Sequence, residues 1–228
     1  MKPFANTIAL RKLSLGEFTA RSGETLALQF AGNDSQTTTD EVAVEEKNDQ
    51  AVIEVTRRWV FEVVIGLNLC PFARRVSDSG LIRYAVTDAG DPEELLVALE
   101  TELVALAASP RSAVETTILI HPKALSDFSD YLAFLGYADR LVRRLGLLNT
   151  IQIAGFHPQY QFEGTTPESP ENYTNRSPQP MLHLLREESV TEVAGDNAAL
   201  AAIPERNIKT LRSLGKAEIL ARLQRING

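Results

Sequence analysis

The sequence has a single cysteine, Cys70, among its 228 residues. One thiol excludes an intrachain disulfide and a metal cluster held by several cysteines. The nucleotide-binding patterns GxGxxG and GxxxxGK[ST] are missing, and so is the GxSxG pattern of α/β-hydrolases. The longest apolar runs, such as VVIGL, are far shorter than the roughly 20 residues of a membrane-spanning helix. No short motif in the sequence therefore identifies a class of function. We also expect no membrane partner.

An excess of positive charge is also missing. The chain has 23 Lys and Arg against 30 Asp and Glu, a formal net charge of −7, which argues against a nucleic-acid partner. Hydrophobic residues make up 44% of the chain, enough to bury a substantial core. Charged residues interrupt the apolar positions near the N-terminus, so no secretory signal core is visible. We expect a soluble, cytoplasmic protein.

The chain changes character near residue 49. Residues 1–48 include most of the polar, acidic stretch GNDSQTTTDEVAVEEKNDQ, which has no helical or strand periodicity and predicts a disordered or weakly ordered leader. Within it, TLALQF is a candidate short strand. From Asp49, apolar residues recur at helical spacing up to about Gly66. We therefore predict a leader over 1–48 and a single α/β domain over 49–228.

Strands and helices alternate in the predicted domain. The patterns indicate strands at 81–86, 115–120 and 150–156, with helices at 91–110 and 125–146 between them. Asp91 is the expected cap of the first of these helices, and Ser126 or Asp127 that of the second. A fourth helix is predicted at 181–193, and further helices at 207–226. The alternation predicts a small, mostly parallel sheet of three strands or slightly more, with helices packed on it and C-terminal helices. The alternative is an α+β sandwich with one antiparallel strand.

Two of the three histidines follow predicted strands. His121 and His157 each come directly after a strand and directly before a proline, and the carboxyl ends of parallel strands share one edge of a sheet. His183 falls in the first turn of the predicted fourth helix, where the helix dipole favours the neutral imidazole that a general base needs. We predict His157 and His183 as catalytic residues and His121 as a substrate contact. The alternative is that each histidine is a packed structural residue.

The segment 158–180 holds five of the eleven prolines and three aromatic residues, which indicates an ordered loop. Arg176 and Ser177 stand at the expected start of the fourth helix, an arrangement that favours an anion. We predict Arg176, Asn172 and Ser177 as substrate-binding residues and Tyr173 as a catalytic residue. The alternative is an ordinary helix start beside a surface arginine.

No metal is predicted, because no metal-ligand spacing motif is present. The alternative metal site would use His121, His157, His183 and Glu187, the last placed one turn after His183 on the predicted helix. Cys70 follows the C-terminal end of the first helix among apolar residues, and both features raise the pKa of a thiol. A buried structural cysteine is therefore favoured over a nucleophile.

Three blocks of sequence carry a resemblance: IGLNLCPFA, GFHPQYQF and NYTNRSPQPMLHLLREESV, in this order. With the two strand–helix units between them, the chain resembles an uncharacterised bacterial family, domain of unknown function 1415, from about residue 50 to residue 214. The resemblance implies a compact, bacterial, cytosolic domain. It lends no catalytic residues, cofactor or substrate.

These observations predict a site for a small anionic molecule at the carboxyl edge of the sheet, with hydrolase or group-transferase chemistry. The alternative is a non-catalytic binding or interaction protein that uses the Pro-rich loop 158–180. Whether the protein is an enzyme, which cofactor it uses and how it oligomerises stay open at this stage.

Overall fold

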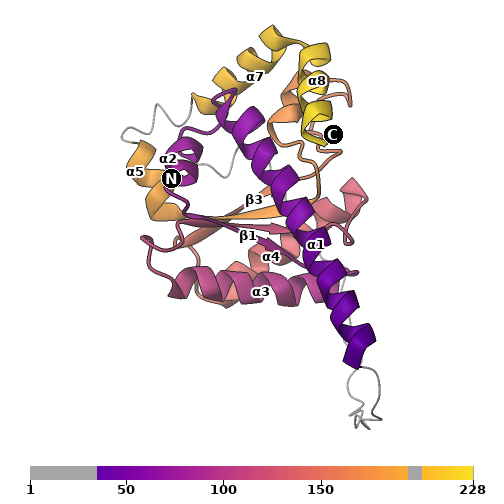
Figure 1. Ribbon diagram of the computed structural model, residues 1–228. Coiled ribbons are helices and arrows are strands. Elements are labelled where there is room, and N and C mark those ends of the chain that lie inside the picture. Colours follow the sequence, from indigo (N-terminus) through magenta and orange to yellow (C-terminus); the bar gives the residue numbers. More distant parts are fainter. Residues whose placement is uncertain (1–34, 195–201, 228) are drawn as a thin grey trace.

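The computed structural model describes residues 35–194 and 202–227, which form a four-stranded sheet with helices on both faces (Figure 1). The leader residues 1–34, with the candidate strand TLALQF, lie outside the described residues. The strands are β1 (Ile82–Val86), β2 (Thr116–Ile120), β3 (Ile151–Phe156) and β4 (Met181–Arg186). The helices are α1 (Ser35–Trp59), α2 (Ala73–Asp78), α3 (Pro92–Ala108), α4 (Phe128–Arg144), α5 (Glu187–Ala194), α7 (Ile203–Leu214) and α8 (Lys216–Asn227), with a π-helix η2 (Val60–Ile65) and a 3-10 helix η3 (Pro170–Thr174).

The sheet order is β1-β2-β4-β3. β1 pairs with β2 in parallel, whereas β4 pairs antiparallel with both β2 and β3. The mix of strands and helices confirms the predicted α/β type. The prediction of a mostly parallel sheet is wrong, because β4 lies between β2 and β3 and makes two of the three pairings antiparallel. With its one antiparallel strand, the sheet resembles the α+β sandwich that was the alternative prediction.

β4 was predicted as the start of a helix. Four of the six residues of its sequence MLHLLR are apolar, and a short, mainly apolar run fits a buried strand and a buried helix equally well. β4 is a central strand with side chains packed on both faces, and its mainly apolar composition is the one expected of a strand covered on both faces.

At the N-terminal end, α1 begins at Ser35, so part of the segment predicted as a disordered leader is helical.

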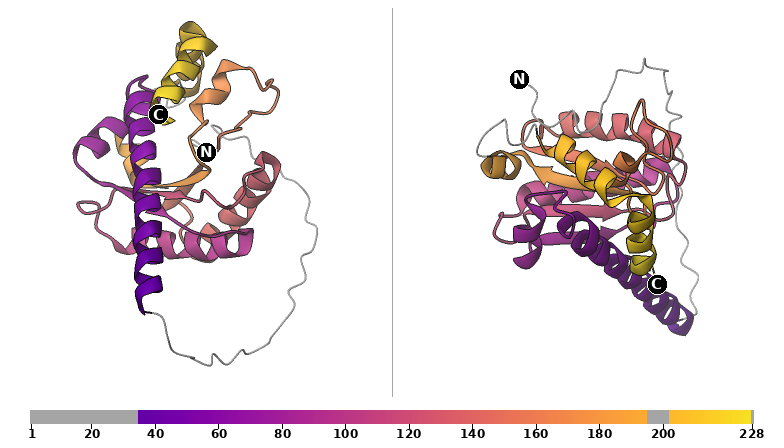
Figure 2. Two further views of the ribbon diagram at one scale, coloured as in Figure 1. Left: turned by 45° about the vertical axis from the view of Figure 1, so that its right-hand side comes forward. Right: turned by 90° about the horizontal axis from the view of Figure 1, so that it is seen from above.

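Each face of the sheet has its own hydrophobic core. Successive strand residues point to opposite faces, so Leu182 and Leu184 of β4 join one core and Met181 joins the other. The first core lies between the sheet and the helices α3 and α4, and the second lies between the sheet and α1, η2, α7 and α8. Figure 2 shows the arrangement of these helices around the sheet. His183, which lies between Leu182 and Leu184, is therefore on the face of the second core.

Capping residues fix the two helices that cover the first face. The Asp91 carboxylate accepts a hydrogen bond from the backbone N–H of Glu94 at 2.8 Å, and that of Asp127 accepts one from Ser129 at 2.7 Å. Asp91 was predicted as the cap of its helix, and Asp127 as one of two candidates. Both are confirmed.

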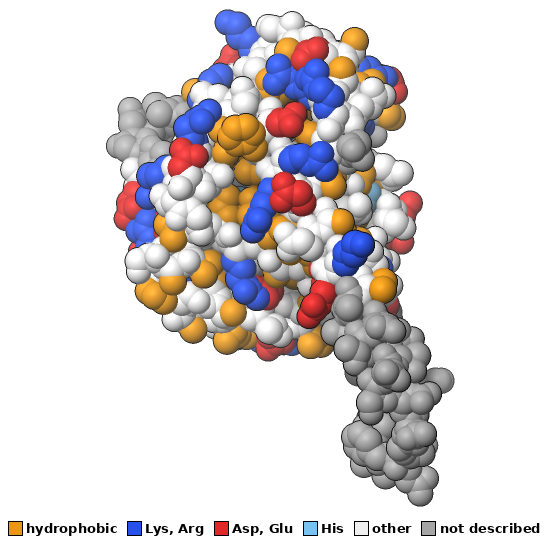
Figure 3. Space-filling model, in the orientation of Figure 1, with side chains coloured by type: hydrophobic (Ala, Val, Ile, Leu, Met, Phe, Trp, Pro, Cys, Tyr) orange, Lys and Arg blue, Asp and Glu red, His pale blue; other side chains and the backbone are white. Residues whose placement is uncertain are grey.

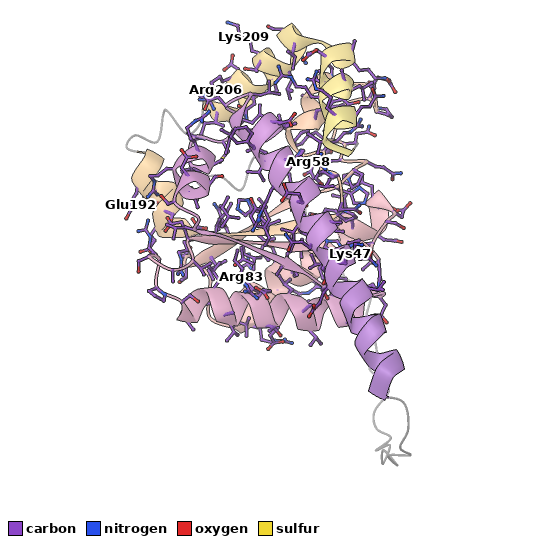
Figure 4. The ribbon with its side chains drawn as sticks, viewed as in Figure 1. Lys47, Arg58, Arg83, Glu192, Arg206 and Lys209 are labelled. Carbon is purple, nitrogen blue, oxygen red and sulfur yellow. The ribbon has the colours of Figure 1, made fainter. Side chains whose placement is uncertain are left out.

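Ion pairs tie helices to strands around the sheet. Arg83 on β1 makes two hydrogen bonds to Glu102 of α3, at 2.8 and 3.0 Å (Figure 4). Arg111 bonds to Glu115, just before β2, and to Glu192 of α5. Paired, planar contacts of this kind fix the geometry between elements.

Gly155 in β3 permits a close approach of α4 to the sheet. A Cβ atom at this position would lie 2.6 Å from the Tyr131 hydroxyl oxygen and 3.2 Å from Cδ1 of Leu135. The Tyr131 hydroxyl passes over the strand and donates a hydrogen bond to the carbonyl of Met181 at 2.9 Å. The glycine therefore lets a buried tyrosine of α4 reach the backbone of β4.

We expect Gly155→Ala to displace Tyr131 and to lower the free energy of unfolding by about 1–3 kcal/mol. Urea denaturation measures this loss. Gly136→Ala is the control, because Gly136 lies within α4 with open space around it, and alanine there should raise stability by up to about 1 kcal/mol. Equal effects at the two glycines would contradict the steric explanation.

Candidate functional site

A cavity of about 660 Å³ extends over the second face of the sheet and around the edge strand β3 to residues of α4. This volume is within the range typical of small-molecule pockets. Figure 3 shows hydrophobic side chains gathered on this side of the molecule, between α2 and α1. Most of the wall is apolar; its residues include Trp59, Val64, Phe72, Ile118, Phe156 and Ile208.

His183 contributes a polar group to the cavity from the sheet. It pairs with Ile118 of β2 and Ala154 of β3, and its side chain is half-buried. Nε2 lies 2.8 Å from the Thr116 hydroxyl, and the ring centroid lies 6.2 Å from that of Phe156. Burial lowers the pKa of His183 to about 4, so the imidazole is neutral at neutral pH.

His121 and His157 lie at the carboxyl ends of β2 and β3, on the other side of the sheet from His183. The Tyr131 ring lies against both, with centroid distances of 5.9 and 5.1 Å. β2 and β3 run in the same direction, which brings these two residues to one edge although β4 separates the strands. The three imidazoles expected at one site are therefore split between two faces.

The contacts of His121 and His157 anchor the segment before α4. The backbone N–H of Gln159 donates to Nδ1 of His157 at 3.0 Å, so the ring proton is on Nε2, which lies 3.1 Å from the Leu125 carbonyl. Nδ1 of His121 lies 3.0 Å from the carbonyl of Ala124. Both side chains are fully buried. The structure shows these backbone contacts of His121 and His157, and the catalytic and binding roles of the two residues stay predictions.

Burial also lowers the pKa of both of these histidines. The pKa of His121 falls to about 4, mainly through burial and further through the nearby His157. Among the described residues, Nε2 of His121 is buried without a hydrogen-bond partner. A proton added there would place a charge in the core, which opposes folding.

Arg176 holds the Pro-rich loop together. Nε donates to the carbonyl of Tyr160 at 3.0 Å, a terminal nitrogen donates to that of Pro167 at 2.8 Å, and the guanidinium stacks 4.6 Å from the Tyr173 ring centroid. Tyr160 and Tyr173 are buried, and Phe162 is half-buried. These aromatic rings therefore pack inside the molecule, and the loop does not present them as a docking surface.

The other residues predicted for anion binding also have structural partners. The Asn172 amide accepts from the backbone N–H of Phe162 at 3.0 Å and donates to the Thr166 carbonyl at 2.7 Å. The Ser177 hydroxyl donates to the carbonyl of Gln179 at 2.6 Å. Ser177 does not cap a helix, because the chain continues into β4.

The alternative metal site is not formed. Glu187 begins α5 after the last residue of β4, so it does not lie one helical turn from His183 as predicted. Within residues 35–194 and 202–227, no group of three or more His, Cys, Asp or Glu side chains is arranged to hold a metal ion. Strand geometry separates the donors that the predicted helix would have aligned.

Cys70 lines the cavity and is half-buried, more accessible than the structural cysteine predicted. Burial raises the pKa of its thiol, although hydrogen bonds from the backbone of Phe72 and Ala73 oppose this. The thiol is thus protonated at neutral pH, which disfavours attack by a thiolate.

The sequence analysis missed Thr116 and the cavity-facing side of Phe156. The alternation of side chains along β2 puts Thr116 and Ile118 on one face of the sheet, but it does not predict which of the two faces borders a cavity.

In the described part of the chain, no helix is both long and apolar enough to cross a membrane.

The order of the strands and the two covered faces define an α/β domain with an open, mixed four-stranded sheet. The chain belongs to the family described as Protein of unknown function (DUF1415), whose model matches residues 51–221. No curated protein and no solved structure matches the sequence. The family is the one that the sequence resembles, and that prediction is confirmed.

We expect His121 to make stability depend on pH. Its folded pKa of about 4 lies below the ordinary value of 6.5, so the stability is complete above pH 6.5 and is lost as the pH falls toward 4. When the pH falls from 7.5 to 5, the free energy of unfolding of the His121→Gln variant should decrease by about 2 kcal/mol less than that of the unmodified protein. Urea titrations at both pH values measure the difference, and identical losses would contradict it. His157 and Tyr131, the titratable groups facing His121, are present in both proteins.

Arg176→Ala should lower the free energy of unfolding by about 1–3 kcal/mol, because two charged hydrogen bonds and a ring contact are lost together. Thermal and urea unfolding measure the effect. Arg140→Ala is the matched control: its guanidinium lies 4.4 Å from the Tyr137 ring centroid on an exposed helix surface. A loss at Arg140 as large as that at Arg176 would contradict the role of the two carbonyl bonds.

Proposed function

We propose that this protein binds a small, largely apolar molecule in the cavity over the second face of the sheet. The observation that carries the proposal is a hollow of about 660 Å³ with a mostly apolar wall, into which a neutral imidazole projects from a central strand. Apolar pockets with a few placed polar groups are the usual form of small-molecule sites. Rigid strands hold the polar group in place.

The proposed site differs in position from the carboxyl-edge site of the sequence analysis. At that edge His121 and His157 are buried, and Arg176 is bonded to two backbone carbonyls. Around the cavity, Glu115 is paired with Arg111 at 2.9 Å and with Arg75 at 3.6 Å. The support is therefore for a ligand held mainly by apolar contact rather than for an anion held by a free arginine.

Hydrolase or group-transferase chemistry on the bound molecule is a further proposal for the same cavity. A neutral His183 is in the form that accepts a proton, which is compatible with general-base chemistry on a bound molecule. The competing proposal, partner docking through loop 158–180, loses the support of exposed aromatic residues, because Tyr160 and Tyr173 are 2% and 5% exposed.

The uncharged dye Nile red tests the proposal, since its fluorescence rises in apolar surroundings. We expect saturable binding, and Ala154→Phe should weaken it by about tenfold or more, a change of about 1.4 kcal/mol. Ala154 lines the cavity beside His183, so a phenyl group there takes up ligand volume.

Ala133→Phe is the matched control, because Ala133 is exposed on α4 and is not one of the residues that line the cavity. Both variants are first compared with the unmodified protein by thermal unfolding. Absence of saturable dye binding, or equal affinity of the two folded variants, would contradict the proposed function.

A further inference from the structure

We infer that the ligand of this cavity is an uncharged molecule that donates a hydrogen bond to Nδ1 of His183, as a hydroxyl or an amide N–H does, and that it is not a carboxylate. This inference rests on the proposed function and names the class of ligand for the same site. It follows from the hydrogen bonds that determine which nitrogen of His183 carries the proton.

The Thr116 hydroxyl sits between His183 and the backbone of β4. Its oxygen lies 2.5 Å from the carbonyl oxygen of Leu184 and 2.8 Å from Nε2 of His183. A carbonyl oxygen only accepts, so the single hydroxyl proton must lie between the two oxygens. Thr116 therefore has no proton left for His183 and accepts one instead. The neutral ring therefore carries its proton on Nε2. His183 Nε2–H donates to Thr116 Oγ1, and the Thr116 hydroxyl donates to the carbonyl oxygen of Leu184.

The second ring nitrogen is left as a hydrogen-bond acceptor. Among the described residues no hydrogen bond reaches Nδ1 of His183. This atom is also not one of the buried polar atoms without a partner, unlike Nε2 of His121. Because His183 lines the cavity and is only half-buried, Nδ1 is open to the occupant of the cavity.

An acceptor in this place selects between ligands. A hydroxyl or amide N–H satisfies the lone pair of Nδ1, whereas an ether leaves it desolvated and without a partner. A carboxylate placed against Nδ1 would need the charged imidazolium as its donor. Burial lowers the pKa of His183 to about 4, so the ring is neutral at pH 7. Trp59 and Phe156, whose rings meet edge to face at 5.3 Å, line the same cavity and favour a flat, aromatic ligand.

The proton position is tested by ¹⁵N NMR of protein labelled at histidine, in which all three imidazoles are observed. At pH 7.5 we expect His183 and His157 as the Nε2–H form and His121 as the Nδ1–H form. Thr116→Val, which removes the acceptor with little change in volume, should shift only the His183 resonances toward a mixture of tautomers. A His183 ring protonated on Nδ1, or one unchanged by Thr116→Val, overturns the inference.

Ligand choice is tested by displacement of Nile red with 1-naphthol, 1-methoxynaphthalene and 1-naphthoate, which share one ring system. We expect 1-naphthol to bind about tenfold more tightly than the ether, and 1-naphthoate to bind most weakly. In His183→Phe the preference for 1-naphthol over the ether should disappear while the ether still binds, and thermal unfolding verifies that the variant folds.

The two failures are distinguishable. If Nile red binds but the ether or 1-naphthoate competes as well as 1-naphthol, or if 1-naphthol displaces no dye, the inference on ligand class is wrong and the proposed cavity stands. If Nile red itself shows no saturable binding, the proposed function is wrong. A preference for 1-naphthol that persists in His183→Phe also overturns the inference, because another group would then supply the acceptor.

Discussion

The pairing of β4 with both β2 and β3 is the interaction on which the rest of the structure depends. It places an antiparallel strand, Met181–Arg186, between two strands that run in the same direction. The chain after β3 must therefore reverse direction before β4 pairs beside it. The hydrogen bonds of Arg176 and Asn172 hold that return path. The same pairing puts His183 in the middle of the sheet.

The two faces of this sheet are filled differently. Under α3 and α4, fully buried leucines and Tyr131 form a continuous core, and Gly155 lets the tyrosine approach the backbone closely. On the other face, η2, α7 and α8 cover the sheet, but a cavity remains near Thr116 and His183. Interiors are normally packed to high density, and this hollow is the space that the proposed ligand would occupy.

The three histidines show why a lowered pKa alone does not identify a functional group. Burial is the largest cause of the shift in every case, and all three rings are neutral near pH 7. Their partners distinguish them. Both nitrogens of His157 are bonded to backbone, His121 has a buried nitrogen without a partner, and His183 lines the cavity with Nε2 bonded to Thr116. His183 alone among them combines a fixed tautomer with access for a small molecule.

The sequence by itself determined β1, β2, β3, α3 and α4, because alternation, helical periodicity and the caps Asp91 and Asp127 act over a few neighbouring residues. It also indicated an ordered Pro-rich loop and the shared edge of His121 and His157. Only the tertiary structure decided that MLHLLR is a strand, that His183 lies on the face opposite the other histidines, and that Arg176 is bonded within its own loop. These features arise from hydrogen bonds between segments distant in sequence. A short, mainly apolar segment forms a helix or a strand according to the partners that the folded chain offers it.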